Sequence, residues 1–102
     1  RRDRMVKRRG YRIELGEIEA GLYRHEAVKE AAVVAVKDDE GGVRIKAFLA
    51  LADGQKVSVI AIRAFCAKAL PSYMMPDSFG VLDHLPKTST DKIDYQRLMQ
   101  AG

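Results

Sequence analysis

One lysine, Lys92, lies in a polar stretch near the C-terminal end of the chain, within the sequence LPKTSTDKIDYQRL of residues 85–98. A lysine in such a loop is usually ordinary surface charge. Here, however, Pro86 precedes the loop and Asp94 is suited to cap a final helical turn, so both ends would be fixed. Asp91 and Asp94 could hold the ammonium group until an anionic ligand, such as a phosphate, arrives. Composition alone leaves both interpretations open: surface charge or a working cation.

The N-terminal arm, residues 1–12, is strongly basic. It holds seven Arg or Lys residues against one Asp, whereas the whole chain has a net charge of +4. Such an arm indicates an anionic partner: a phosphate, a nucleotide, a nucleic acid or an acidic protein. Tyr11 is the only aromatic residue there, and nucleic-acid binding needs aromatic platforms or a recognition helix, so this use is disfavoured. A noncatalytic basic module that binds an acidic protein or nucleic acid is kept as the alternative function.

Other reactive residues show no pattern of a metal or nucleophile site. His25 and His84 lie far apart, and Cys66 falls on the apolar face of a predicted helix, so no pair has the spacing of metal ligands. There is no G-x-G-x-x-G or Walker-type loop and no Ser–His–Asp signature. A single cysteine fits a reducing compartment, and we expect a cytoplasmic protein. The apolar runs fall far short of the ~18–20 residues that span a bilayer, so we expect no membrane partner, and the charged N-terminus predicts no signal peptide.

These residues need a scaffold, and the sequence predicts a single α+β domain over residues 1–102. A length of about 100 residues suits one domain with a small core. We expect a small antiparallel or mixed sheet with an N-terminal β-hairpin and about three packed helices. The elements are, in chain order, short strands at 5–8 and 11–13 around a turn at Gly10, a helix over 14–25, strands at 28–37 and 43–52, a helix from Ser58 to Pro71, a strand at 78–83 and a final helical turn after Asp94.

Charges and apolar spacing support the two longer helices. Acidic residues fall early in the first helix and Arg24 and His25 fall at its end, which is the arrangement that the helix dipole favours. In the second helix the apolar residues follow one face, which predicts that Cys66 is a core residue. The acidic residues are Glu14, Glu17 and Glu19, and the apolar face is Ile62, Phe65, Cys66, Ala69 and Leu70.

Three segments together resemble signatures of the adenylate-forming enzyme superfamily, which includes acyl-CoA synthetases, adenylation domains of nonribosomal peptide synthetases and luciferases. The segment RRDRMVKRRGYRIELGEIE (1–19) is similar to Gly-Arg-x-Asp, three variable residues, Lys-x-Arg-Gly-x-Arg-Ile-Glu and then Glu-Ile-Glu. LPKTSTDKID resembles the signature Leu-Pro-x-Thr-x-x-Gly-Lys-Ile/Val-Asp, and LPSYMMPDSF between them also looks like a family segment. Their order and spacing cover nearly the whole chain. The resemblance implies the small C-terminal lid subdomain of an AMP-forming ligase, without the large N-terminal domain that binds ATP and the acid.

The resemblance also implies roles for particular residues. Lys92 matches the catalytic lysine of the adenylation step, which contacts the carboxylate substrate and ATP. Asp3 matches the hinge about which the subdomain swings, and Arg1 matches an arginine that contacts the nucleotide ribose. Gly10 and Arg12 match the loop that faces the active site after the swing, where the thiol of CoA or of a carrier-protein phosphopantetheine enters.

The chemistry needs such residues. Attack of a carboxylate on ATP brings two anions together, and catalysis of this kind is mostly positioning plus electrostatic stabilisation. The thiol must later enter where Lys92 had been, so a whole-domain swing about a short hinge can serve both steps. ATP with Mg²⁺ would be bound mainly by the large N-terminal adenylation subdomain, which is the expected partner, and the isolated chain should be inactive.

One position departs from the family pattern: Asp91 stands where the family usually has Gly. If the loop needs a positive φ there, Asp tolerates it better than most residues, at some cost. Asp91 could also pair with Lys92 and compete with the phosphate. The segments RIELGEIE and LPSYMMPDSF favour activation of an amino acid with a carrier protein as acceptor. An acyl-CoA synthetase with another carboxylic acid as substrate and CoA as acceptor is the close alternative.

Overall fold

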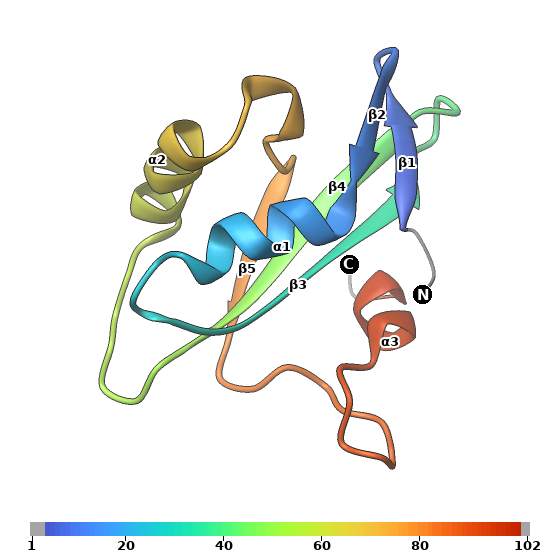
Figure 1. The fold of residues 1–102 in the computed structure, drawn as a ribbon. Helices are drawn as coiled ribbons and strands as arrows, with labels where there is room; N and C mark the ends of the chain where they lie inside the picture. Colours follow the sequence, from blue (N-terminus) through green and yellow to red (C-terminus); the bar gives the residue numbers. More distant parts are fainter. Residues whose placement is uncertain (1–3, 101–102) are drawn as a thin grey trace.

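The computed structural model describes residues 4–100 and has an α+β fold, as the sequence predicts (Figure 1). An N-terminal hairpin is followed by a three-stranded sheet and three helices, with a short 3₁₀ turn before the last strand. The elements are β1 (Met5–Arg8), β2 (Tyr11–Glu14), α1 (Leu15–Tyr23), β3 (Val28–Lys37), β4 (Val43–Leu51), α2 (Val59–Ala69), the 3₁₀ turn η1 (Ser72–Met74), β5 (Ser78–Leu82) and α3 (Tyr95–Gln100).

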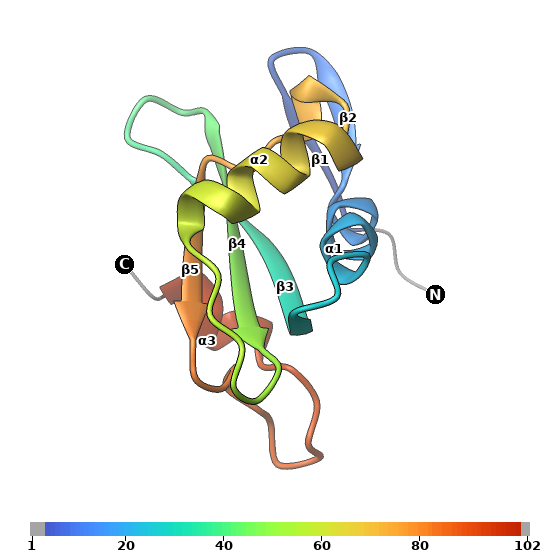
Figure 2. The ribbon, with the colours of Figure 1, turned by 90° about the vertical axis from the view of Figure 1, so that its left-hand side faces the viewer.

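Strand β4 is the centre of the larger sheet. It pairs with β3 in antiparallel fashion and with β5 in parallel fashion, so the sheet is mixed, and β1 and β2 form a separate two-stranded sheet. Residues 47–50 of β4 are all buried, which means that both faces of this strand are covered. Helices α1 and α2 pack on one face and α3 packs on the other, as Figures 1 and 2 show in two directions.

Side chains cover the outer edge of β3. The amide of Val33 donates to Glu19 Oε2 (2.8 Å), and its carbonyl accepts from Arg4 Nη1 (3.0 Å). The amide of Ala31 donates to the hydroxyl of Tyr23 (3.0 Å). An unpaired edge strand can pair with other chains, and these contacts satisfy backbone groups that would otherwise be available for such pairing.

Helix α1 is shorter than the sequence predicts, because it ends at Tyr23. Arg24 lies outside it as the C-cap, and its guanidinium donates to the carbonyl of Ala69 (3.3 Å). The expectation that Arg24 and His25 occupy the last helical turn is therefore wrong. The physical reason is local: the Nδ1 of His25 accepts from the amide of Ala27 (3.1 Å), which turns the chain towards β3.

Two predicted caps and one predicted core residue are confirmed. The hydroxyl of Ser58 accepts from the amide of Ala61 (3.0 Å) at the start of α2. The carboxylate of Asp94 accepts from the amide of Arg97 (3.2 Å) at the start of α3. Cys66 is fully buried, and this burial raises the pKa of its thiol.

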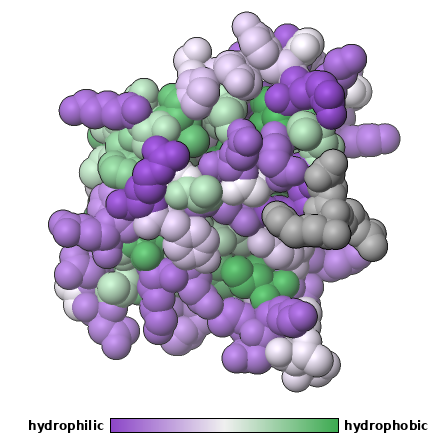
Figure 3. Space-filling model, in the orientation of Figure 1, coloured by the Kyte–Doolittle hydropathy of each residue, from purple (hydrophilic) through white to green (hydrophobic). Residues whose placement is uncertain are grey.

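The surface is mostly hydrophilic on the face drawn in Figure 3, and its hydrophobic residues form separate patches there. Within residues 4–100, no helix has the length and apolar character needed to cross a membrane.

Candidate functional site

The lysine loop, residues 86–94, is a small hairpin that extends from one end of the domain, between β5 and α3 (Figure 1). The amide of Thr88 donates to the carbonyl of Lys92 (2.7 Å), and the amide of Asp91 donates to the carbonyl of Thr88 (2.9 Å). Three residues thus connect Thr88 to Lys92. This is a common hairpin loop, in which a turn is followed by a residue in the left-handed region.

Asp91 is that left-handed residue, with φ = 65°. Glycine adopts a positive φ at no steric cost, unlike residues with a Cβ. Position 91, where the chain has Asp in place of the glycine of the expected pattern, has this backbone conformation. Aspartate is among the few other residues that adopt this conformation routinely. The backbone of the loop therefore keeps its shape although glycine is replaced.

Lys92 presents its ammonium group to solvent. The residue is exposed, and its backbone amide is bound to the Thr88 hydroxyl (3.3 Å). Among residues 4–100, no side chain forms an ion pair or hydrogen bond with this ammonium group. The expectation that Asp91 or Asp94 holds it is wrong, because the Asp94 carboxylate caps α3 instead and Asp91 makes no ion pair with Lys92.

The base of the lysine loop is tied to the domain. Lys87 forms an ion pair with Glu30 of β3 (2.8 Å), and the hydrogen bond that its ammonium group donates to that carboxylate raises the pKa of the lysine. The amide of Asp94 donates to the carbonyl of Pro86 (2.9 Å), which closes the loop. Leu85, just before it, is buried against the sheet. The loop therefore has a fixed base and an exposed cation near its end.

The basic hairpin, formed by β1, β2 and their turn, is the second candidate region. Arg8 and Tyr11 face each other across the hairpin, and Arg9 (φ = 53°) and Gly10 (φ = 83°) form the turn. Positive φ at both central residues is the mark of a type I′ turn. A side chain added at Gly10 would meet no atom within 4 Å, so glycine is needed for its backbone angle rather than for space. Arg12 is exposed on β2.

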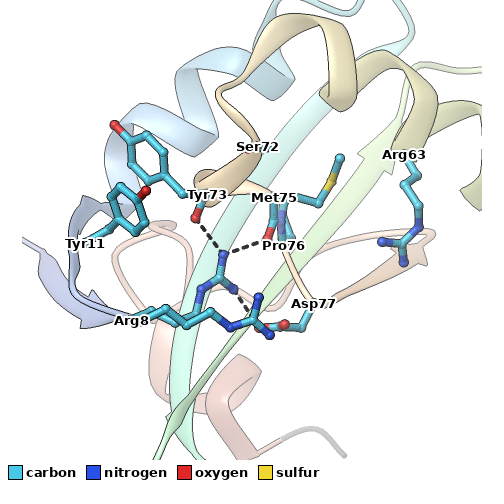
Figure 4. A pocket seen from close by; sticks show the side chains of 9 residues that line it. Arg8, Tyr11, Arg63, Ser72, Tyr73, Met75, Pro76 and Asp77 are labelled. Atoms are coloured by element: carbon cyan, nitrogen blue, oxygen red, sulfur yellow. Dashed lines mark hydrogen bonds and ion pairs between the residues drawn. The ribbon is translucent and has the colours of Figure 1, made fainter.

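Arg8 fixes this hairpin to the rest of the domain (Figure 4). Its guanidinium donates to Asp77 Oδ2 (2.8 Å) and to the carbonyls of Tyr73 (2.8 Å) and Met75 (2.9 Å), and only 9% of its side chain is exposed. The same Asp77 oxygen accepts from the amide of Ile45 in β4 (2.7 Å). One carboxylate thus joins the hairpin to the central strand.

A basic, partly aromatic cavity lies at this junction. The rings of Tyr11 and Tyr73 stack at 4.3 Å with an interplanar angle of 12°. Beside them is a solvent-open cavity of ≈510 Å³, lined in part by Arg8, Arg9 and Arg63. Arginines present planar donors that suit phosphate and carboxylate groups, so this end of the domain is suited to anions.

The tyrosine cluster, made of Arg4, Glu19 and Tyr95, is a third polar group. Glu19 pairs with Arg4 (2.8 Å) and accepts a hydrogen bond from the Tyr95 hydroxyl (3.0 Å), while the Arg4 guanidinium lies 4.7 Å from the centre of the Tyr95 ring. Burial, together with the Glu19 charge, raises the pKa of Tyr95 to about 12. The hydroxyl therefore stays protonated as a donor at neutral pH.

The structure separates the predicted site residues into two groups. The lysine loop, which contains Lys92, lies at one end of the domain (Figures 1 and 2). The basic hairpin, which contains Gly10 and Arg12, lies at the opposite end. Arg1 and Asp3, the expected ribose contact and hinge, lie outside the described residues.

Sequence reasoning missed the contacts that hold these regions in place. Arg8 and Asp77 are 69 residues apart, so no local pattern could pair them. Glu19 was expected to act on the helix dipole, but it binds Arg4 and Tyr95. Strand alternation could have indicated that Arg8 and Lys7 face opposite sides of the hairpin, although not which partner Arg8 meets.

Comparison with known proteins identifies a family. The family described as AMP-binding enzyme C-terminal domain matches residues 17–92. The chain is 44% identical over 101 residues to bacitracin synthase 1 of Bacillus licheniformis, which covers 99% of this chain and 2% of that protein. It is 42% identical over 100 residues to L-proline–[L-prolyl-carrier protein] ligase of Streptomyces coelicolor, which covers 96% of this chain and 18% of that protein.

Solved structures agree with the sequence relatives. The crystal structure of an acyl-CoA synthetase from Brucella canis superposes with a TM-score of 0.84 at 33% identity, covering 98% of this chain and 19% of that one. The chain thus spans less than a fifth of the length of these three proteins.

Proposed function

The chain belongs to the family of AMP-binding enzyme C-terminal domains, the small subdomain of adenylate-forming ligases, and from this premise we propose that it is the mobile lid of an enzyme that activates a carboxylic or amino acid with ATP. The observation that carries this proposal is the lysine loop. Its base is tied by an ion pair and by backbone hydrogen bonds, and its exposed lysine, Lys92, has no ion-pair partner within residues 4–100.

In the first step, Lys92 would reach from the lysine loop to the place where the acid meets ATP. The attacking carboxylate and the phosphates are all negative, and charge develops further on the leaving pyrophosphate. A positioned ammonium group stabilises that charge, and it is most effective where water is excluded. We propose that Mg²⁺ accompanies ATP on the large domain; residues 4–100 contain no group of three or more His, Cys, Asp or Glu side chains that could hold a metal ion.

In the second step, the basic hairpin would face the active site in place of the lysine loop. Gly10 keeps the turn narrow, and Arg12 adds positive charge on the exposed side of β2. The separation of the two regions supports a rotation of the domain between the two steps. Since they lie at opposite ends of one rigid domain, they can reach the same active site only if the domain rotates.

The geometry around Arg4 supports a hinge at Asp3. The amide of Arg4 donates to Glu14 Oε2 (3.1 Å), its carbonyl accepts from the amide of Leu15 (3.0 Å), and its side chain pairs with Glu19. Arg4 is therefore fixed to the domain, and we propose that the rotation takes place before it. We propose Asp3 as the hinge and Arg1 as a contact to the nucleotide ribose.

For the acceptor, we propose the phosphopantetheine thiol of a carrier protein, with an amino acid as the activated substrate. Bacitracin synthase 1 and the L-proline–[L-prolyl-carrier protein] ligase are 44% and 42% identical to the chain, whereas the similar solved acyl-CoA synthetase is 33% identical. CoA is the second candidate, because that structure matches nearly the whole chain. A cytoplasmic location, where ATP and reduced thiols are available, suits either acceptor.

The test uses the full-length enzyme and measures amino-acid-dependent pyrophosphate exchange. We expect Lys92→Ala to reduce exchange by on the order of 100-fold or more, as expected when a group that stabilises developing charge is removed. Lys37→Ala, which removes another exposed lysine, is the control and should retain full exchange. Normal exchange by Lys92→Ala would refute the proposal. Salt-sensitive binding of an acidic protein or oligonucleotide by the chain, unaffected by Lys92→Ala, would then favour the noncatalytic module.

A further inference from the structure

The tyrosine cluster joins the two ends of the described chain. Arg4 is the first described residue, and Tyr95 is the first residue of α3, the last helix. Glu19, on α1, binds both: Oε1 lies 2.8 Å from Arg4 Nη2 and Oε2 lies 3.0 Å from the Tyr95 hydroxyl. The Glu19 side chain is only 13% exposed, so these contacts are largely shielded from water.

The same cluster lies next to both moving parts of the proposed mechanism. On one side, Arg4 directly follows the proposed hinge residue, Asp3. On the other side, Tyr95 follows Lys92 by three residues, and Asp94 between them closes the lysine loop through its bond to Pro86. A shift of the start of α3 would therefore move the base of the loop.

Helix α3 alone provides limited support for this loop. It has six residues, of which only Leu98 is buried. Helices this short depend on tertiary contacts for their position. The Tyr95 hydroxyl provides such a contact on the side of the helix nearest the loop, and it connects the helix to α1 and to Arg4.

We propose that Tyr95 and Glu19 are positioning residues for the adenylation step: they hold the lysine loop in a fixed orientation relative to the hinge, so that rotation of the domain brings the Lys92 amine to the reacting phosphate. This inference rests on the proposed function. The inference extends the proposed function by giving Tyr95 and Glu19 a role in the adenylation step only. The thiol-transfer step, which uses the opposite end of the domain, does not depend on this contact.

Tyr95→Phe in the full-length enzyme is the direct test. It keeps the ring near Arg4 and removes only the hydroxyl, while Glu19 keeps its bonds to Arg4 and to the amide of Val33. We expect kcat for adenylation to fall roughly tenfold, less than the ~100-fold that a 1 Å misplacement can cost. The KM for ATP and the rate of thioester formation from preformed acyl-adenylate should stay unchanged. Glu19→Gln, which removes the charge but not the shape, should show the same selectivity.

Tyr23→Phe is the matched control. It also removes a tyrosine hydroxyl bound at the edge of β3, but the hydrogen bonds of this hydroxyl go to Ala31 and not to α3. It should leave both steps unchanged. A second readout is non-additivity: in a Lys92→Ala background, Tyr95→Phe should cause no further loss, because the group it positions is gone.

The outcomes separate the two claims. Equal loss of both steps in Tyr95→Phe, or a profile identical to that of Tyr23→Phe, would overturn the positioning role while Lys92→Ala still supported the proposed function. Full pyrophosphate exchange by Lys92→Ala would overturn both.

Discussion

Asp91 combines two effects that substitution can separate: a left-handed backbone and a negative charge next to Lys92. Asp91→Gly removes the charge and any backbone strain. Asp91→Asn removes the charge and keeps a side chain that tolerates positive φ. Asp91→Ala removes the charge and adds strain. The three variants therefore distinguish a conformational effect from an electrostatic one.

The stability changes follow from φ = 65° at this position. A residue with an ordinary Cβ costs about 1–2 kcal/mol in the left-handed region, and Asp costs less because its short polar side chain can bond locally. Glycine avoids this cost, but its greater conformational freedom in the unfolded chain lowers the unfolding free energy by about 0.5–1 kcal/mol. We expect Asp91→Gly to lie within about 0.5 kcal/mol of the unsubstituted chain and Asp91→Ala to lose about 1 kcal/mol. A loss of that size lowers Tm by about 4–8 °C in a domain of this length.

The effect on activity is electrostatic. Exposed pairs of opposite charge are worth about 0.2–1 kcal/mol, and the middle of that range corresponds to about threefold in rate. Removing the Asp91 charge should therefore speed adenylation about threefold in both Asp91→Gly and Asp91→Asn. The effect should shrink at high salt, because exposed charges are screened.

Thermal melts of the 102-residue chain and pyrophosphate exchange by the full-length enzyme measure the two effects. If Asp91→Ala melts at the same temperature as Asp91→Gly, the backbone angle does not constrain this position. If Asp91→Gly is faster and Asp91→Asn is not, the charge argument is wrong and the gain comes from backbone freedom.

Three further predictions concern contacts that hold the domain together. Asp77→Ala should lower the unfolding free energy by about 2–3 kcal/mol in urea titrations, because it breaks the ion pair to Arg8 and leaves the Ile45 amide without its acceptor. Asp77→Asn keeps an oxygen that can accept from this amide and should cost less. Equal costs for the two variants would contradict the role of that acceptor. The unfolding free energy should fall as the pH rises from 10 to about 12, because the pKa of Tyr95 is raised to about 12 in the folded state, so Tyr95 loses its proton first in the unfolded chain. Tyr95→Phe should show a smaller fall over the same pH range. A fall of the same size in Tyr95→Phe would contradict the assignment to Tyr95. Cys66 should react with iodoacetamide only on unfolding, since burial shields the thiol and raises its pKa. Rapid labelling of the native chain would refute the place of Cys66 in the core.

Local patterns predict much of this fold. Two apolar runs joined by turn-type residues place β3 and β4, with alternation in β4, and side-chain caps at Ser58 and Asp94 mark the starts of two helices. These features depend on neighbouring residues, so a sequence contains them directly. The positive φ at Asp91 is also foreseeable, because the signature it resembles has glycine there.

Contacts between distant segments could not be predicted in this way. Arg8 reads as one more charge of the basic arm, yet it is nearly buried against Asp77 and two carbonyls. Glu19 reads as a helix-dipole residue, yet it binds Arg4 and Tyr95. Both pairings depend on how β1 and α3 pack against the sheet, which no local periodicity specifies.

The central claim is that one domain delivers Lys92 for the first step and withdraws it for the second. Single-turnover rates of the two half-reactions in full-length Lys92→Ala test this most directly: acyl-adenylate formation from ATP, and thioester formation from preformed adenylate. We predict that the first falls by on the order of 100-fold or more while the second keeps its rate. Equal loss in both half-reactions, or none in the first, would contradict the account.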